Sequence, residues 1–79
     1  MKLFWRENCP KCPSAKALIA NSINAEYFNV DEVDGMAEAA YYGVLSTPSI
    51  VVAKEDGKEI KTWHGEVPLQ GEIEKWLLN

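Results

Sequence analysis

The two cysteines of this chain, Cys9 and Cys12, are separated by two residues. One helical turn would bring their Cα atoms to roughly 5–6 Å, which is within the range of a disulfide. A bridge that closes such a short loop removes little entropy from the unfolded chain, so it would stabilise the fold only weakly. We therefore expect this pair to carry reversible disulfide chemistry rather than to hold the fold together.

A strand followed by a helix is expected around the cysteine pair. Residues 3–5 form a short apolar run that predicts a strand. Pro10 suits the first turn of a helix, because that turn does not need its N–H group, and Asn8 or Cys9 would then be the cap. Pro13 would remove a further backbone hydrogen bond, so we expect the first turn to be irregular.

The expected position of the thiols gives each one a different role. Backbone N–H groups at the start of a helix favour a thiolate at Cys9, and Lys11 adds a cation beside it. Cys9 is therefore the expected nucleophile. Cys12 lies one turn deeper on the same side, where it can attack a mixed disulfide formed at Cys9. We expect Cys12 to be the resolving cysteine.

Size and charge limit the possible classes of protein. The chain has 79 residues and a net charge of −4, and we expect a single domain over residues 1–79. Lysines and glutamates are interspersed, which argues against a nucleic-acid partner and against acidic partners. The charged residues near the start argue against a signal peptide. No apolar stretch approaches the length of about 20 residues that a membrane span needs. We expect a monomeric cytoplasmic protein, in which a lone C-x-x-C is typical of redox or metal chemistry.

The first half of the chain predicts strand, helix, strand, helix. Apolar residues at helical spacing mark the first helix, namely Ala15, Leu18, Ile19 and Ile23. Residues 26–30 predict the second strand, and Asp31 is the expected cap of the next helix. Tyr41 and Tyr42 are expected to pack beside the buried face of that helix. The residues expected on this face are Met36, Ala39, Ala40 and Gly43.

The second half predicts a hairpin and a final helix. Residues 49–53 form a nearly continuous apolar strand, residues 55–58 a turn in which Gly57 supplies a positive φ, and residues 59–63 the returning strand. An amphipathic helix follows, marked by Leu69, Ile73, Trp76 and Leu77. The expected fold is α/β, with a four-stranded mixed sheet flanked by three helices in the order βαβαββα. This is the order of the minimal thioredoxin fold.

Three segments together resemble the thioredoxin and glutaredoxin superfamily. They are Phe4-Trp5, the C-P-K-C of Cys9 to Cys12, and the run from Gly43 to Ile50 that contains Ser46-Thr47-Pro48. With the segment from Gly65 to Pro68, the chain is most similar to the small thioredoxin-like redox-active disulfide proteins of bacteria and archaea.

This resemblance implies a function and a substrate site. Pro48 would be a cis-proline facing the cysteines, and Thr47 would expose its backbone to an extended client segment. Pro10 and Lys11 would complete the substrate surface beside the nucleophile. The implied activity is a thiol–disulfide oxidoreductase that reduces protein disulfides, with no cofactor of its own. Its implied partners are disulfide-containing client proteins and a separate electron-donating reductase.

Several residues differ from those typical of the superfamily. Leu3 stands where thioredoxins usually carry a buried aspartate, so another base or water would have to accept the proton of the resolving thiol. Glutaredoxins usually have Thr-Val-Pro and a Gly-Gly with a following aspartate, whereas this chain has Thr47-Pro48 after a serine, and Gly65-Glu66. Thioredoxins also favour Trp-Cys-Gly-Pro-Cys. The electron donor therefore stays open between thioredoxin reductase, glutathione and ferredoxin-dependent donors.

Two other classes of function compete with this interpretation. Small copper chaperones also place a C-x-x-C between a strand and a helix, although their element order is strand-helix-strand-strand-helix-strand. A non-catalytic adaptor could keep the same fold in order to bind a partner.

For Trp5 we expect packing in the core or at its rim, with a substrate-lining role as the alternative. Lys11, His64 and Glu66 are expected to be exposed to solvent.

Overall fold

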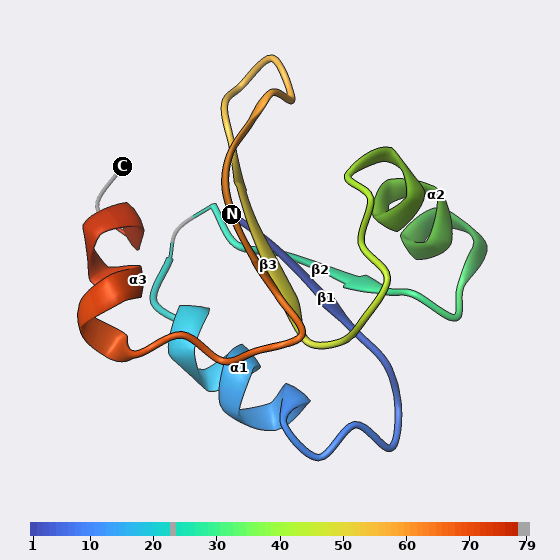
Figure 1. The fold of residues 1–79 in the computed structure, drawn as a ribbon, viewed down its shortest axis with the longest axis horizontal. Coiled ribbons are helices and arrows are strands. Elements are labelled where there is room, and N and C mark those ends of the chain that lie inside the picture. The colour runs from blue at the N-terminus through green and yellow to red at the C-terminus, as the bar shows by residue number, and fades with distance from the viewer. Residues whose placement is uncertain (23, 78–79) are drawn as a thin grey trace.

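The chain folds into a four-stranded sheet with helices on both faces (Figure 1). This computed structural model describes residues 1–22 and 24–77. The elements in chain order are β1 (Lys2–Trp5), α1 (Cys12–Ile19), β2 (Glu26–Asn29), α2 (Val33–Tyr41), β3 (Ser49–Ala53), β4 (Glu59–His64) and α3 (Gln70–Leu77). The predicted fold class and element order are confirmed, and the order differs from that of the small copper chaperones.

The sheet is mixed, with strand order β2-β1-β3-β4. β1 pairs parallel to β2, while the β1–β3 and β3–β4 pairs are antiparallel. The turn between β3 and β4 contains Gly57 at φ 88°, a backbone conformation that glycine adopts without steric cost. The predicted hairpin is therefore present, and β4 continues one residue further than expected, to His64.

Alternate residues of the central strands fill two separate cores. Leu3 and Ile50 point to the face that α1 and α3 cover, where Ile73 of α3 joins them. Phe4 and Val51, the next residues along the same strands, point to the opposite face under α2. Figure 1 shows α1 and α3 on one side of the sheet and α2 on the other. This alternation is the two-residue period of a strand that is buried on both faces.

The buried face of α2 differs from the prediction. Gly35 and Ala39 are the buried residues of this helix, whereas Met36 and Ala40 are exposed. The helix approaches β2 so closely that only a glycine fits at position 35, and this contact rotates the helix relative to the predicted face. Its cap is Glu32 rather than Asp31, and no side chain caps it.

Other residues of the predicted helical faces agree with the prediction only in part. Gly43, Tyr41 and Leu69 are exposed, contrary to the prediction. Tyr42 packs against the core under α2 and Trp76 against the core under α3, as predicted. Leu69 precedes α3 instead of belonging to it. Ile23 and the side chain of Leu77, both expected on helical faces, lie outside the described residues. Within the described part of the chain, no helix is long and apolar enough to cross a membrane.

Candidate redox site

The loops that follow β1 and precede β3 meet at one edge of the sheet. Phe4, next to the end of β1, pairs with Ser49, the first residue of β3, and Ser49 also pairs with His64 at the end of β4. The loop with the cysteines, residues 43–48 and the segment after β4 therefore share this edge, which is the lower one in Figure 1. We call it the redox edge.

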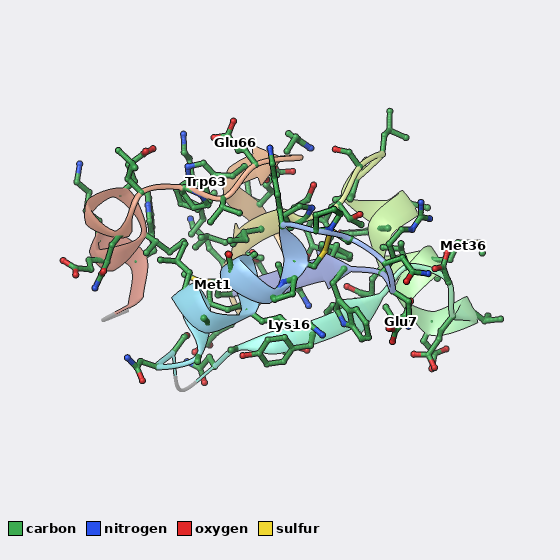
Figure 2. All side chains as sticks on the ribbon, turned by 90° about the horizontal axis from the view of Figure 1, so that it is seen from below. Met1, Glu7, Lys16, Met36, Trp63 and Glu66 are labelled. Carbon is green, nitrogen blue, oxygen red and sulfur yellow. A yellow bond between two sulfur atoms is a disulfide. The ribbon has the colours of Figure 1, made fainter. Side chains whose placement is uncertain are left out.

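A disulfide joins Cys9 and Cys12 at the redox edge. Figure 2 looks onto this edge and shows the disulfide as a yellow bond. The two Cα atoms are 5.4 Å apart, and the backbone N–H of Cys12 donates a hydrogen bond of 3.2 Å to the carbonyl oxygen of Cys9. Cys9 is half-buried, whereas Cys12 is 2% exposed. A thiol or thiolate from solvent therefore reaches Cys9 more easily than Cys12.

Helix α1 begins three residues later than Cys9, so the predicted cap is wrong. Its N-cap is Lys11 and its first residue is Cys12. Pro13 explains this start, because a helix begun near Pro10 would need the missing N–H of Pro13 for a bond to the Cys9 carbonyl. Beginning at Cys12 places Pro13 in the first turn, where no N–H group is required. Cys9 therefore lies in the turn before the helix and not at its cap.

The loop between β1 and the disulfide is fixed by a few side-chain contacts. Arg6 forms an ion pair of 3.1 Å with Asp31, which follows β2. Asn8 has φ 61°, a left-handed conformation that asparagine tolerates better than most residues. The Nζ of Lys16 lies 3.4 Å from the centre of the Trp5 ring, so α1 is joined to the end of β1 by a cation–π contact. Trp5 is half-buried, and its contact with Lys16 leaves both predicted roles, packing at the rim and lining the substrate surface, open.

The predicted substrate residues come from two loops at the redox edge. Pro10 and Lys11 are exposed in the turn between the cysteines. The peptide bond between Thr47 and Pro48 is cis, as the resemblance implied. Pro48 is buried and Thr47 is half-buried. The sequence-predicted site residues are thus brought to one edge, while His64 and Glu66 are exposed, as expected.

Comparison with known proteins agrees with this geometry. A family profile described as a thioredoxin domain matches residues 1–78. The chain belongs to this family. It is 30% identical over 59 residues to a thioredoxin of Methanocaldococcus jannaschii, an alignment that covers 66% of this chain and 67% of the relative. The disulfide between Cys9 and Cys12 is compatible with the redox activity of the thioredoxin family.

The sequence analysis missed a small cavity beside the disulfide loop. It has a volume of about 360 Å³ and lies between α2 and residues 43–48, with Arg6 and Thr47 both in its wall. Met36, Ala40 and Leu45 contribute apolar lining, and the side chain of Leu45 is 96% exposed. The sequence feature that could have indicated this cavity is the set of apolar residues in α2 that the sheet does not cover.

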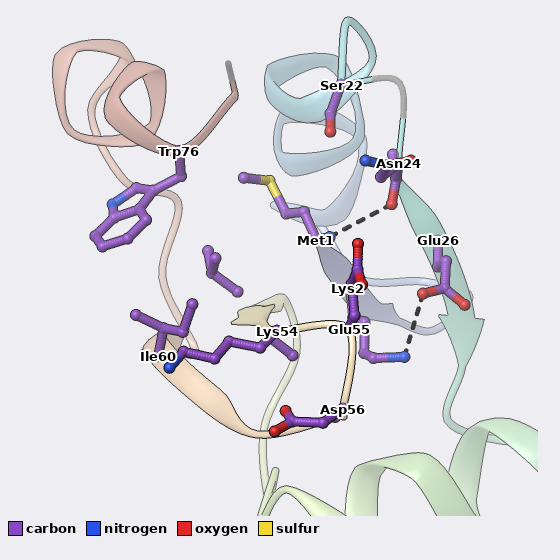
Figure 3. Close-up of a pocket in the computed structure, with 14 residues that line it drawn as sticks. Met1, Lys2, Ser22, Asn24, Glu26, Lys54, Glu55, Asp56, Ile60 and Trp76 are labelled. Carbon is purple, nitrogen blue, oxygen red and sulfur yellow. Dashed lines mark hydrogen bonds and ion pairs between the residues drawn. The ribbon is translucent and has the colours of Figure 1, made fainter. Parts of the chain in front are cut away.

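A second hollow lies at the opposite edge of the sheet, away from the cysteines. It is an open groove of about 1140 Å³ between the start of β1, the start of β2, the β3–β4 hairpin and α3. Figure 3 shows Ser22 and Trp76 toward the top of this groove, Met1 near its middle and Asp56 of the hairpin at the bottom. Lys2 and Glu26 form an ion pair of 3.2 Å in its wall. Among residues 1–22 and 24–77, no three His, Cys, Asp or Glu side chains form a group that could hold a metal ion.

Proposed function

We propose that this protein is a thiol–disulfide oxidoreductase that reduces disulfides in client proteins. The observation that carries the proposal is the Cys9–Cys12 disulfide, with a half-buried first cysteine and a buried second one, at the same edge of the sheet as the cis Thr47–Pro48 bond. Membership of the thioredoxin family supports the same reaction class.

The proposed reaction transfers two electrons from the dithiol to the client. The Cys9 thiolate attacks one sulfur of the client disulfide, which forms a mixed disulfide and releases the other client sulfur as a thiolate. The Cys12 thiolate then attacks the Cys9 sulfur, which re-forms the Cys9–Cys12 disulfide and releases the second client thiolate. Both client thiolates take up protons from solvent. A separate reductase supplies two electrons and restores the dithiol.

The surface around the disulfide provides a place for the client. In this proposal an extended client segment pairs with the backbone of Thr47 as an added strand, with Pro48 beneath it. Pro10 and Lys11 contact the client next to the attacked sulfur. No cofactor takes part, because the electrons pass between sulfur atoms.

The test uses insulin as the client and separates the roles of the two cysteines. The unmodified protein should accelerate insulin reduction by dithiothreitol, and Cys9→Ser should abolish this acceleration because the attacking thiolate is lost. Cys12→Ser should instead accumulate a mixed disulfide with insulin, visible by mass spectrometry. Since the chain has 2 cysteines, any adduct of that variant must be at Cys9. Insulin reduction by Cys9→Ser at the unmodified rate would contradict the proposed roles.

A further inference from the structure

Ser49 is a buried polar residue at the redox edge, and the roles proposed above leave it unused. It is 0% exposed and begins β3, between Phe4 of β1 and His64 of β4. Its hydroxyl donates a hydrogen bond of 2.8 Å to the carbonyl oxygen of Ser46 and accepts one of 3.1 Å from the N–H of Gly65. The hydroxyl therefore connects two loops that are far apart in the sequence.

The two hydrogen bonds restrain the segment that contains Thr47. The bond from Ser49 to the Ser46 carbonyl closes across Thr47 and Pro48, so both ends of this short segment are held. The hydrogen bond from the Gly65 N–H joins the Ser49 hydroxyl to the loop after β4. Because Ser49 is paired on both sides within the sheet, it is a fixed anchor for these contacts.

The close fit of Ser46 and Gly65 adds to this restraint. Gly65 has φ 67°, and a Cβ built there would lie 2.8 Å from the Oγ of Ser46. A side chain at position 65 would therefore crowd the Ser46 side chain, and the positive φ would strain its backbone. Because Gly65 has no side chain, the loop after β4 can contact the loop that carries Thr47 next to the Ser49 hydroxyl.

We propose that Ser49 is a positioning residue, whose hydroxyl holds the Thr47 backbone where an extended client segment pairs with it. This inference rests on the proposed function and names the group that sets its client surface. Ser49 acts through the loop and touches neither the client nor the sulfur atoms. Removing its hydroxyl should therefore impair the reduction of a protein client more than the reduction of a small disulfide reagent.

The test compares two buried side chains of nearly equal shape. Ser49→Val and Ser49→Thr both add a methyl group, but only the threonine variant keeps the hydroxyl. The measured quantity is the ratio of the insulin reduction rate to the rate with dithionitrobenzoate, a small aromatic disulfide. For Ser49→Val this ratio should fall about three- to tenfold, the effect of weakening one backbone hydrogen bond. For Ser49→Thr it should stay within about twofold of the unmodified protein.

Controls distinguish a positioning role from a purely structural one. Circular dichroism and urea midpoints show whether each variant is folded, and Ser49→Ala replaces Ser49→Val if the valine variant is not. Equal ratios in the valine and threonine variants would overturn the proposal, as would an equal loss of both rates in the valine variant. If the unmodified protein reduced the small disulfide but not insulin, the proposed function would fail and the role of Ser49 with it.

Discussion

Lys2 lies in a cluster of charged and aromatic side chains on β1. Its Nζ is 3.2 Å from Glu26 and 3.5 Å from Glu38, and it lies over the rings of Phe28 and Tyr42. Burial lowers the pKa of Lys2, but the hydrogen bond to Glu26 and the charges of Glu26 and Glu38 outweigh it and raise the pKa above its usual value. Burial also raises the pKa of Tyr42, although the nearby Lys2 cation opposes this effect.

These two shifts predict that the protein loses stability in alkaline solution. Each group keeps its proton in the folded state at a pH where the unfolded chain releases it, so the stabilisation is complete below the unfolded pKa values of about 10. It is lost as the pH rises through the folded pKa values. The urea concentration at the unfolding midpoint should therefore decrease as the pH rises above about 10, the range of the unfolded pKa values of Lys and Tyr. Lys2→Met should be less stable at pH 8 than the unmodified protein, with a shallower alkaline decline; a midpoint that rose with pH would contradict this account.

At the scale of elements, the packing of α2 against β2 depends on Gly35. A Cβ built at this position overlaps the carbonyl oxygen of Asn29 and lies 2.6 Å from its carbonyl carbon. These are backbone atoms of the last residue of β2, so they cannot move aside as a flexible side chain can. Helix and strand are therefore in direct backbone contact at this point.

Gly35→Ala should accordingly destabilise the protein, and a second helical glycine provides the matched control. We expect a loss of about 1–3 kcal/mol or more for Gly35→Ala, because the added methyl group overpacks a site bounded by backbone. Gly71→Ala in α3 should be neutral or stabilising by up to about 1 kcal/mol, since no atom lies within 4 Å of its built Cβ and alanine favours helix. Urea unfolding of both variants is the measurement. Equal stability of the two would show that α2 does not approach β2 so closely.

The elements could be predicted from the sequence because each has a local pattern. Alternation and apolar runs located the strands, and Gly57 located the hairpin turn. The face of α2 could not be predicted in this way, since the contact of Gly35 with Asn29 depends on how a helix lies on a strand. The start of α1 at Cys12 could have been predicted, because Pro13 already indicated an irregular first turn.

The candidate site was predictable in part for the same physical reason. The spacing of Cys9 and Cys12 and the position of Pro48 before a strand are local features. The contacts of Ser49 are not, because one of its partners lies 16 residues away in another loop. The single sequence signal was a serine at the start of an otherwise apolar buried strand, since a buried hydroxyl needs hydrogen-bond partners.

At the scale of the whole molecule, stability comes from two thin cores on either side of one sheet. A domain of this length is expected to have a free energy of unfolding of roughly 4–12 kcal/mol, from 0.05–0.15 kcal/mol per residue. Helix α3 contributes Ile73 to the core that it shares with α1, and the side chain of Ile73 is 0% exposed. A hydrogen bond of 3.4 Å from the indole N–H of Trp63 to Glu72 also joins β4 to this helix.

Ile73→Ala should therefore remove a large share of the total stability. Deleting a buried isoleucine side chain costs about 2–5 kcal/mol through lost burial and the cavity left behind. Leu69→Ala is the control, because Leu69 lies just before the same helix but is 73% exposed, and its loss should change stability by no more than about 0.5 kcal/mol. Urea unfolding of both variants in the oxidised state measures the difference without changing the Cys9–Cys12 pair. A cost for Leu69→Ala equal to that for Ile73→Ala would mean that Leu69 packs in the core, as its place on the predicted amphipathic face implies, and would contradict its exposed position in the structure.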